Sequence, residues 1–179
     1  MYFNETNSFH YVDHRYVKQA GGIASERNYP YIGEPYDNYS QDCYFDEETM
    51  VEAKVKRYKM IEVTKTALPE EAIAEALVKH GPISAALDAT GFQHYKGGVF
   101  YNSDCNSIYL THGITIVGFT KNYWIIKNSW GTEWGDEGYI YLAKDRSNHC
   151  GIATYPAYVV TDKPSQNLPQ FGKPRSILT

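Results

Sequence analysis

The sequence predicts an α+β fold, in which helices and a sheet of short strands occupy different parts of the chain. Two helix signatures lie before residue 83, and a series of short segments rich in β-branched and aromatic residues follows it. Because the connections between these segments are short, we expect antiparallel pairing. We also expect the strands to close into a barrel-like sheet, since closure removes exposed edges.

The first helix is predicted over residues 8–20. Its apolar residues fall near helical spacing, and Gly21 and Gly22 supply an ending. Residues 29–41 are rich in Tyr, Pro, Gly and Asn, which indicates a surface loop. The second helix begins at Pro69 with acidic residues in its first turn, and the pair Gly81-Pro82 ends it.

The predicted strands are separated by Gly, Asn and Asp turns. They cover residues 83–89, 98–101, 113–120, 123–129, 138–143 and 154–160. Residues 161–179 contain three prolines among polar residues and show no periodicity. We expect this segment to be a mobile tail without a catalytic role.

Composition excludes some classes of function. With 42% hydrophobic and 15% aromatic residues the chain is expected to fold, and its 179 residues suffice for one domain or two small lobes. The net charge of −4 comes from scattered acidic and basic residues, so nucleic acid is not an expected partner. No stretch is apolar enough for a membrane span, and the N-terminus lacks the regions of a signal peptide, so a secretion signal would lie upstream of Met1.

A histidine, an amide and an indole form the strongest chemical pattern. His112 opens an apolar strand, and Asn128 leaves the next strand two residues before Trp130. Cys/His hydrolases need an imidazole base, a polar group that orients it and an apolar cover over their hydrogen bond. We therefore interpret these three residues as candidates for those roles, although a single histidine at a strand start is more often structural.

Other histidines of the chain do not indicate a catalytic role. His80 ends a helix, where a cationic side chain suits the helix dipole. His10 and His14 share a helix face, but Tyr11 follows the first of them where a zinc metalloprotease needs Glu. We expect neither a metal nor another cofactor.

Several motifs together resemble the C-terminal half of papain-like cysteine proteases of the cathepsin L type. The resemblance runs from about the N-terminus to about residue 160. The motifs are Thr111-His112-Gly113, Trp124-Ile125-Ile126-Lys127-Asn128-Ser129-Trp130-Gly131, Trp134-Gly135 with Gly138-Tyr139, and Asn148-His149-Cys150-Gly151-Ile152-Ala153. The resemblance implies an α+β papain-like fold with a barrel-like right-hand lobe and an incomplete helical left-hand lobe. It divides the chain into a peptidase portion, residues 1–160, and a tail, residues 161–179.

The resemblance also implies the roles of individual residues. His112 would be the catalytic base, Asn128 would orient its ring, and Trp130 would shield their hydrogen bond. The main specificity pocket would be lined by Ala86, Leu110 and Gly113, whose small or aliphatic character implies a preference for hydrophobic side chains. Met1, and the pair Tyr155-Pro156, match further positions near this pocket.

The cysteines are the main departure from the family pattern. By resemblance, Cys105 and Cys150 would form a disulfide, and the partner of Cys43 would lie upstream. None of the three has the Cys-Gly-Ser-Cys-Trp surroundings of the nucleophile, and the glutamine of the oxyanion hole has no match. Alone, the chain is expected to be inactive.

Three interpretations remain open. The chain is a C-terminal part of a cysteine endopeptidase whose N-terminal portion or companion chain carries the nucleophile. Alternatively, it is an inactive pseudopeptidase that binds peptides or a protein partner. The third is an aromatic-rich carbohydrate-binding or interaction module, which 17 tyrosines permit but no motif requires. For the first, the resemblance implies peptide or protein substrates and a lysosomal or extracellular location.

Overall fold

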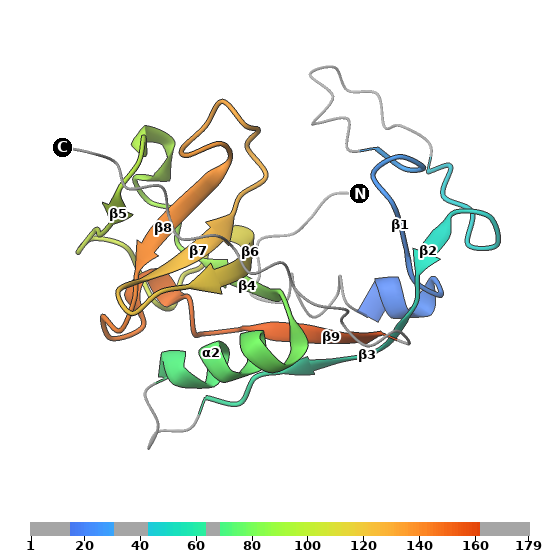
Figure 1. Cartoon of the computed structure of the whole chain (residues 1–179), viewed down its shortest axis with the longest axis horizontal. Helices are drawn as coiled ribbons and strands as arrows, with labels where there is room; N and C mark the ends of the chain where they lie inside the picture. Colours follow the sequence, from blue (N-terminus) through green and yellow to red (C-terminus); the bar gives the residue numbers. More distant parts are fainter. Residues whose placement is uncertain (1–14, 31–42, 64–68, 162–179) are drawn as a thin grey trace. The chain divides into compact units, whose positions relative to one another are not determined.

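The structure is a computed structural model that describes residues 15–30, 43–63 and 69–161 (Figure 1). The chain forms two compact units. Of the described residues, the first unit holds 15–30, 43–59 and 159–161, and the second holds 60–63 and 69–158. Among the described helices, none is long and apolar enough to cross a bilayer. The candidate catalytic residues all belong to the second unit.

The first unit contains short elements. Residues 15–19 are helical, so the described part agrees with the end of the helix predicted over 8–20, while residues 8–14 lie outside the described residues. Strands β1 (Ile23–Ala24) and β2 (Val51–Ala53) pair antiparallel. Most of the loop predicted over 29–41, and the whole predicted tail after residue 161, also lie outside the described residues.

Strand β3 (Val55–Met60) follows β2 directly, and neither strand is among the sequence predictions. Strand β2 is very short and half of the residues of β3 are charged, so the apolar alternation that marks a half-buried strand is weak here. Most residues of these two strands are accordingly exposed. A strand that buries few side chains leaves little trace in the hydrophobic pattern.

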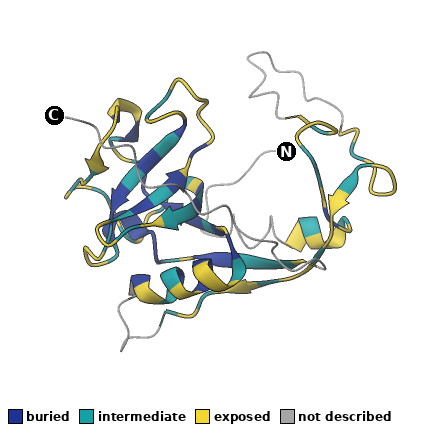
Figure 2. Ribbon diagram, viewed as in Figure 1, coloured by how far each residue is buried: buried dark blue, intermediate teal, exposed yellow. Residues whose placement is uncertain are grey.

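The predicted second helix is confirmed as α2 (Pro69–His80). Its buried face carries Ile73, Ala76 and Leu77, while the opposite face is exposed (Figure 2). This face packs against β4 and β6. The helix ends where the Gly81 amide donates to the Leu77 carbonyl 3.0 Å away, and Gly81 has a φ of +92°, which favours glycine.

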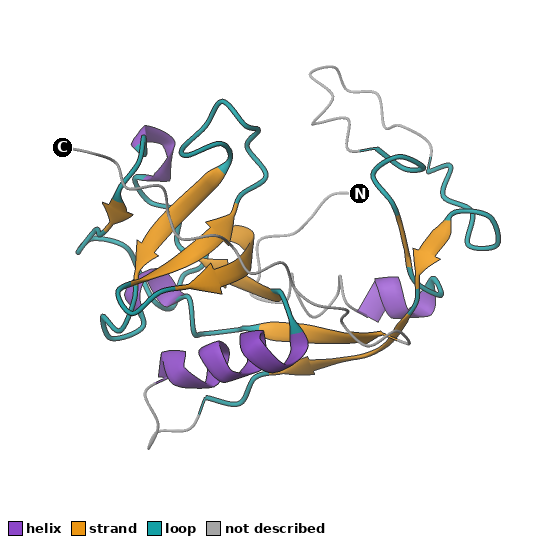
Figure 3. Ribbon diagram, viewed as in Figure 1, coloured by secondary structure: helices purple, strands orange, loops and turns teal. Residues whose placement is uncertain are grey.

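The sheet of the second unit is built mainly from four antiparallel strands (Figure 3). In spatial order they are β4 (Ile83–Leu87), β6 (His112–Phe119), β7 (Tyr123–Lys127) and β8 (Tyr139–Ala143). Strand β9 (Ala157–Thr161) joins β4 through the pair Ser84 and Ala157. In the strand order, β3 is the neighbour of β9.

Two details of the predicted sheet are wrong, although the α+β class is confirmed. Strand β5 (Val99–Phe100) pairs with β8 in parallel, because the connection between them is long and the rule for short connections does not apply. The described strands also form an open order, with β3 at one end and β5 at the other, instead of a closed barrel.

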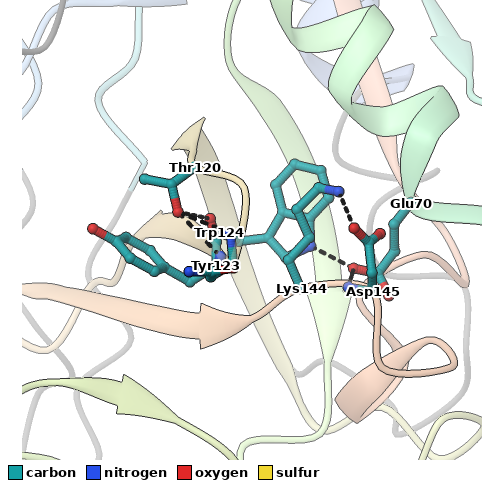
Figure 4. Close-up of polar contacts among 7 residues, drawn as sticks. Glu70, Thr120, Tyr123, Trp124, Lys144 and Asp145 are labelled. Atoms are coloured by element: carbon teal, nitrogen blue, oxygen red, sulfur yellow. Dashed lines mark hydrogen bonds and ion pairs between the residues drawn. The ribbon is translucent and has the colours of Figure 1, made fainter.

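The core lies between α2 and the sheet, and a buried carboxylate is tied into it. The Trp124 indole N–H and the Asp145 amide both donate to Glu70 Oε2, each at 2.8 Å (Figure 4). Lys144 Nζ lies 2.6 Å from Asp145 Oδ2 and 5.3 Å from the centroid of the Trp124 ring. Glu70 therefore has partners in the interior and connects the start of α2 to β7.

Candidate active site

His112 and Asn128 meet because of the register of the sheet. His112 is the first residue of β6, and Asn128 directly follows the last residue of β7. The two strands are antiparallel, with Thr115 opposite Lys127, so the start of one lies beside the end of the other. On its other side β6 pairs with β4, where Leu87 is opposite His112. The site thus stands on a central strand of a rigid sheet.

The hydrogen bond between them is well defined. His112 Nε2 lies 2.7 Å from Asn128 Oδ1, and the Ser129 amide donates to the same oxygen at 2.8 Å. An amide N–H can only donate, so the side-chain atom that receives it is the carbonyl oxygen. Oδ1 must then also accept the bond from His112, and the ring therefore carries its proton on Nε2. Nδ1 is left to accept a proton in the neutral ring.

An indole covers this pair. The ring centroids of Trp130 and His112 are 4.9 Å apart with an interplanar angle of 40°. Trp130 in turn meets Trp134 edge to face at 5.0 Å, and the Trp134 N–H donates to the Phe92 carbonyl at 3.0 Å. Asn128 is 8% exposed, whereas Trp130 is 41% exposed. Trp130 thus covers a buried amide while keeping one side in solvent.

The loop between β7 and β8 holds both indoles in place. The backbone N–H of Asn128 donates to the Gly138 carbonyl at 3.0 Å, and this bond closes the loop where it leaves the sheet. Gly135 has a φ of +64°, and a Cβ there would lie 2.5 Å from the Tyr139 carbonyl oxygen. No residue with a side chain fits that position without movement, so the glycine in Trp134-Gly135 serves the loop's geometry.

The predicted pocket residues are only partly brought together by the described contacts. Ala86 on β4 is paired with Gly113 on β6, one position from the catalytic candidate. Leu110 lies in the loop before β6 and packs against Gly151, where a Cβ would be 2.3 Å from the Leu110 Cδ2. Of the remaining candidates, Tyr155 is 39% exposed and Met1 lies outside the described residues.

The structure contains the Cys105–Cys150 disulfide that the family resemblance implied. Cys43 is a free, exposed thiol in the first unit, where the Tyr29 hydroxyl lies 3.8 Å from its sulfur. Among the described residues, no cysteine sulfur forms a hydrogen bond with His112. The described contacts of the His112 ring are with Asn128 and Trp130.

Some parts of the site were not predicted from the sequence. The Ser129 amide fixes the orientation of Asn128, and the Phe92 carbonyl anchors Trp134. Asp88 is a polar residue directly after a buried strand, and that pattern could have singled it out in the sequence. The contact between Phe92 and Trp134 joins residues far apart in the chain, so no local pattern indicated it.

Comparison with known sequences gives the family. The profile of the family described as "Papain family cysteine protease" matches residues 7–160. A digestive cysteine proteinase 3 of Homarus americanus is 42% identical over 149 residues, which cover 80% of this chain and 43% of that protein. Cathepsin L2 of Homo sapiens is 40% identical over 154 residues, with 80% and 43% of the two chains covered.

Comparison with solved structures gives the same family. The digestive procathepsin L2 proteinase from the larval midgut of Tenebrio molitor superposes with a TM-score of 0.68 at 35% identity, and the match covers 83% of this chain and 45% of that one. The chain thus spans less than half the length of the relatives it matches. A profile match over most of the chain, together with these identities, shows that the chain belongs to the papain family of cysteine proteases.

Proposed function

We propose that this chain is the part of a papain-like cysteine endopeptidase that carries the base and its orienting amide. One observation supports this most strongly: Asn128 Oδ1 accepts from both His112 Nε2 and the Ser129 amide, under the Trp130 ring. These contacts fix the tautomer of the ring and bury its amide partner. A base that must offer one particular nitrogen needs both.

The proposed chemistry uses the two ring nitrogens differently. Nδ1 of His112 takes the proton of a cysteine thiol, the thiolate attacks the scissile carbonyl carbon, and the same nitrogen returns the proton to the leaving amine. Nε2 keeps its proton throughout and donates it to Asn128 Oδ1. Water then hydrolyses the thioester, with the imidazole again acting as base. Trp130 keeps bulk water from the hydrogen bond.

The thiol belongs, in this proposal, to a segment outside the given chain. Two of the chain's cysteines form a disulfide, and the sequence around Cys43 does not match the surroundings of the family's nucleophile. The chain alone is therefore expected to have no peptidase activity, because losing the nucleophile from a cooperative catalytic unit removes nearly all covalent catalysis. Its partner would be an N-terminal portion or a companion chain.

We further propose peptide or protein substrates with a hydrophobic side chain in the main pocket. Ala86, Leu110 and Gly113 offer only small or aliphatic surface there. For location, we propose the lysosome or the extracellular space, as for the family. The Cys105–Cys150 disulfide is consistent with an oxidising compartment.

A thiol-directed epoxide or vinyl sulfone probe tests this proposal on the natural protein that contains the chain. Labelling of one cysteine outside this chain, located by mass mapping, would support it. The variant His112→Ala should lose the label, while Val78→Ala, at an exposed position of α2, should keep it. Label on Cys43 in the natural protein would overturn the assignment of the nucleophile.

The alternative is an inactive pseudopeptidase that binds peptides or a protein partner. The absence of a nucleophile from the chain's own cysteines favours it. It predicts no label on the natural protein, combined with measurable binding of apolar peptides that Leu110→Glu weakens. Activity-based labelling with turnover of a peptide substrate would exclude it.

A further inference from the structure

A buried carboxylate stands next to the strand pair that carries His112. Asp88 directly follows β4, and the last residue of that strand, Leu87, is opposite His112. Asp88 is only 5% exposed. Burying an ionised carboxylate is costly unless hydrogen bonds replace its water. The partners of Asp88 therefore indicate why the charge is there.

Both oxygens of Asp88 accept hydrogen bonds from the turn and loop around it. Oδ2 accepts from the Asn106 amide at 2.6 Å. Oδ1 accepts from the Thr90 amide at 3.1 Å, from the Thr90 hydroxyl at 2.8 Å, and from the Thr111 hydroxyl at 3.4 Å. Burial alone would raise the pKa of Asp88, but these donors outweigh it and hold that pKa below its ordinary value. The carboxylate stays ionised.

One of these partners, Thr111, is the residue immediately before His112. Its amide donates to the Leu87 carbonyl at 2.9 Å, and its hydroxyl accepts from the Ala89 amide at 3.1 Å while reaching Asp88. Thr111 is thus held through its backbone and its side chain at once. The entry into β6 has little freedom to shift.

A second partner, Asn106, holds the loop that leads to Thr111. Its Oδ1 accepts from the Ile108 amide at 2.7 Å and the Tyr109 amide at 3.0 Å. The neighbouring Cys105 is tied by its disulfide to Cys150, whose carbonyl accepts from the Asp88 amide at 2.8 Å. One carboxylate therefore joins both ends of the segment 106–111 to the end of β4.

We propose that Asp88 is a positioning residue for catalysis. Through Asn106 and Thr111 it fixes where β6 begins, and it so holds the His112 ring in the position that its reaction requires. The inference rests on the proposed function of His112 as the base. Asp88 itself does not touch substrate. The groups it binds, the Asn106 backbone amide and the Thr111 hydroxyl, lie at the two ends of the segment that immediately precedes the base.

The inference has a kinetic consequence. A displacement of roughly 1 Å in a reacting group is enough to cost up to about a hundredfold in rate. The variant Asp88→Asn keeps the shape but places an NH2 group where one oxygen now accepts a hydrogen bond. We expect kcat per titrated active site to fall about tenfold and KM to rise by less than that, because Asp88 itself touches no substrate although Leu110 of the pocket lies in the segment it holds.

The pH dependence of thiol alkylation by iodoacetamide gives a readout that a purely structural role would leave unmoved. The imidazolium stabilises the thiolate, so a displaced His112 raises the pKa of the thiol. The acidic limb of the alkylation profile should therefore move to higher pH in Asp88→Asn. Thr111→Val, which deletes the hydroxyl without changing shape, should shift the limb in the same direction, and Thr111→Ser should restore it.

The experiment uses the natural, active protein that contains this chain. Ile73→Val, a core change in α2, is the control for lost stability: it should lower the melting temperature without moving kcat or the alkylation profile. If wild type is active while Asp88→Asn and Thr111→Val both match it in kcat and profile, the positioning role is overturned. If wild type itself shows no labelling or turnover, the proposed function fails instead. Should Asp88→Asn not fold, the Thr111 pair decides.

Discussion

The oxygen of Asn128 accepts two hydrogen bonds at once, from His112 Nε2 at 2.7 Å and from the Ser129 amide at 2.8 Å. The backbone donor fixes the side-chain orientation, and the orientation fixes the tautomer of the ring. Nδ2 of the same side chain is buried and has no hydrogen-bond partner among the described residues.

In the natural, active protein that contains this chain, Asn128→Ala should lower kcat by about 10- to 100-fold, because the ring then samples both tautomers and more than one orientation. Asn128→Asp keeps an acceptor for both donors and should retain more activity than the alanine variant. Steady-state kinetics on a peptide ester, with active sites titrated, would measure both. Equal activities of the two variants would contradict the orienting role.

Trp130→Ala should lower kcat by roughly tenfold, because water then competes for the His112–Asn128 hydrogen bond. Trp130→Phe keeps an aromatic cover and should lose less. The ring lies 4.9 Å from the imidazole, so its removal also leaves space above the base. Stopped-flow acylation rates would separate the two variants; an alanine variant as fast as the phenylalanine one would count against shielding.

Leu110→Glu should reverse the selectivity of the main pocket. A carboxylate there would reduce kcat/KM for a substrate with an apolar side chain by about 10- to 100-fold, and would favour a basic one. Competition between two peptides that differ only at that side chain measures the ratio. Leu110→Met, which preserves volume and polarity, is the matched control and should keep the apolar preference. An unchanged ratio in the glutamate variant would remove Leu110 from the pocket.

Replacing Cys105 and Cys150 together by serine should lower the free energy of unfolding by about 4 kcal/mol in the chain-entropy account. The bond spans 45 residues, so its loss frees a long loop in the unfolded chain. Urea denaturation of the double variant and of wild type, with and without reductant, checks this. Reductant should weaken only wild type, and a loss in the variant as well would indicate another cause.

Acid should remove the stability that Asp88 contributes. Its pKa lies below the ordinary value of 3.8, so the contribution is fully present above that value and is lost as pH falls through the lowered pKa. The difference in urea midpoint between wild type and Asp88→Asn should therefore be constant near neutral pH and shrink in strong acid. A difference that grows on acidification would mean that Asp88 is destabilised as a carboxylate.

The elements that bury a regular apolar pattern were predictable from the sequence. Helix α2 has its acidic start, its apolar face and its Gly81-Pro82 ending, and β6 and β7 are continuous apolar runs. Strand β2 is very short and half of the residues of β3 are charged, so neither shows such a pattern. The parallel pairing of β5 depends on a long connection, which local spacing does not describe.

The candidate site, too, was predictable only in part from the sequence. His112 and Asn128 stood out because each sits at the end of an apolar strand, but their contact depends on the register of β6 and β7. The anchoring of Trp134 by Phe92 links residues 42 positions apart and has no signature in either segment. Residue types can be read along the chain, whereas the hydrogen bond between them is a property of tertiary structure.

Strand β7 begins next to an anchor and ends in the site. Its second residue, Trp124, is fastened to Glu70 at the start of α2, and Asn128 follows its last residue. Asn128 thus follows directly on a strand whose other end is anchored in the hydrophobic core by a hydrogen bond. Loosening of the imidazole on heating should then coincide with melting of the core, so an NMR signal from the His112 ring and the near-UV circular dichroism of the tryptophans should disappear in one transition.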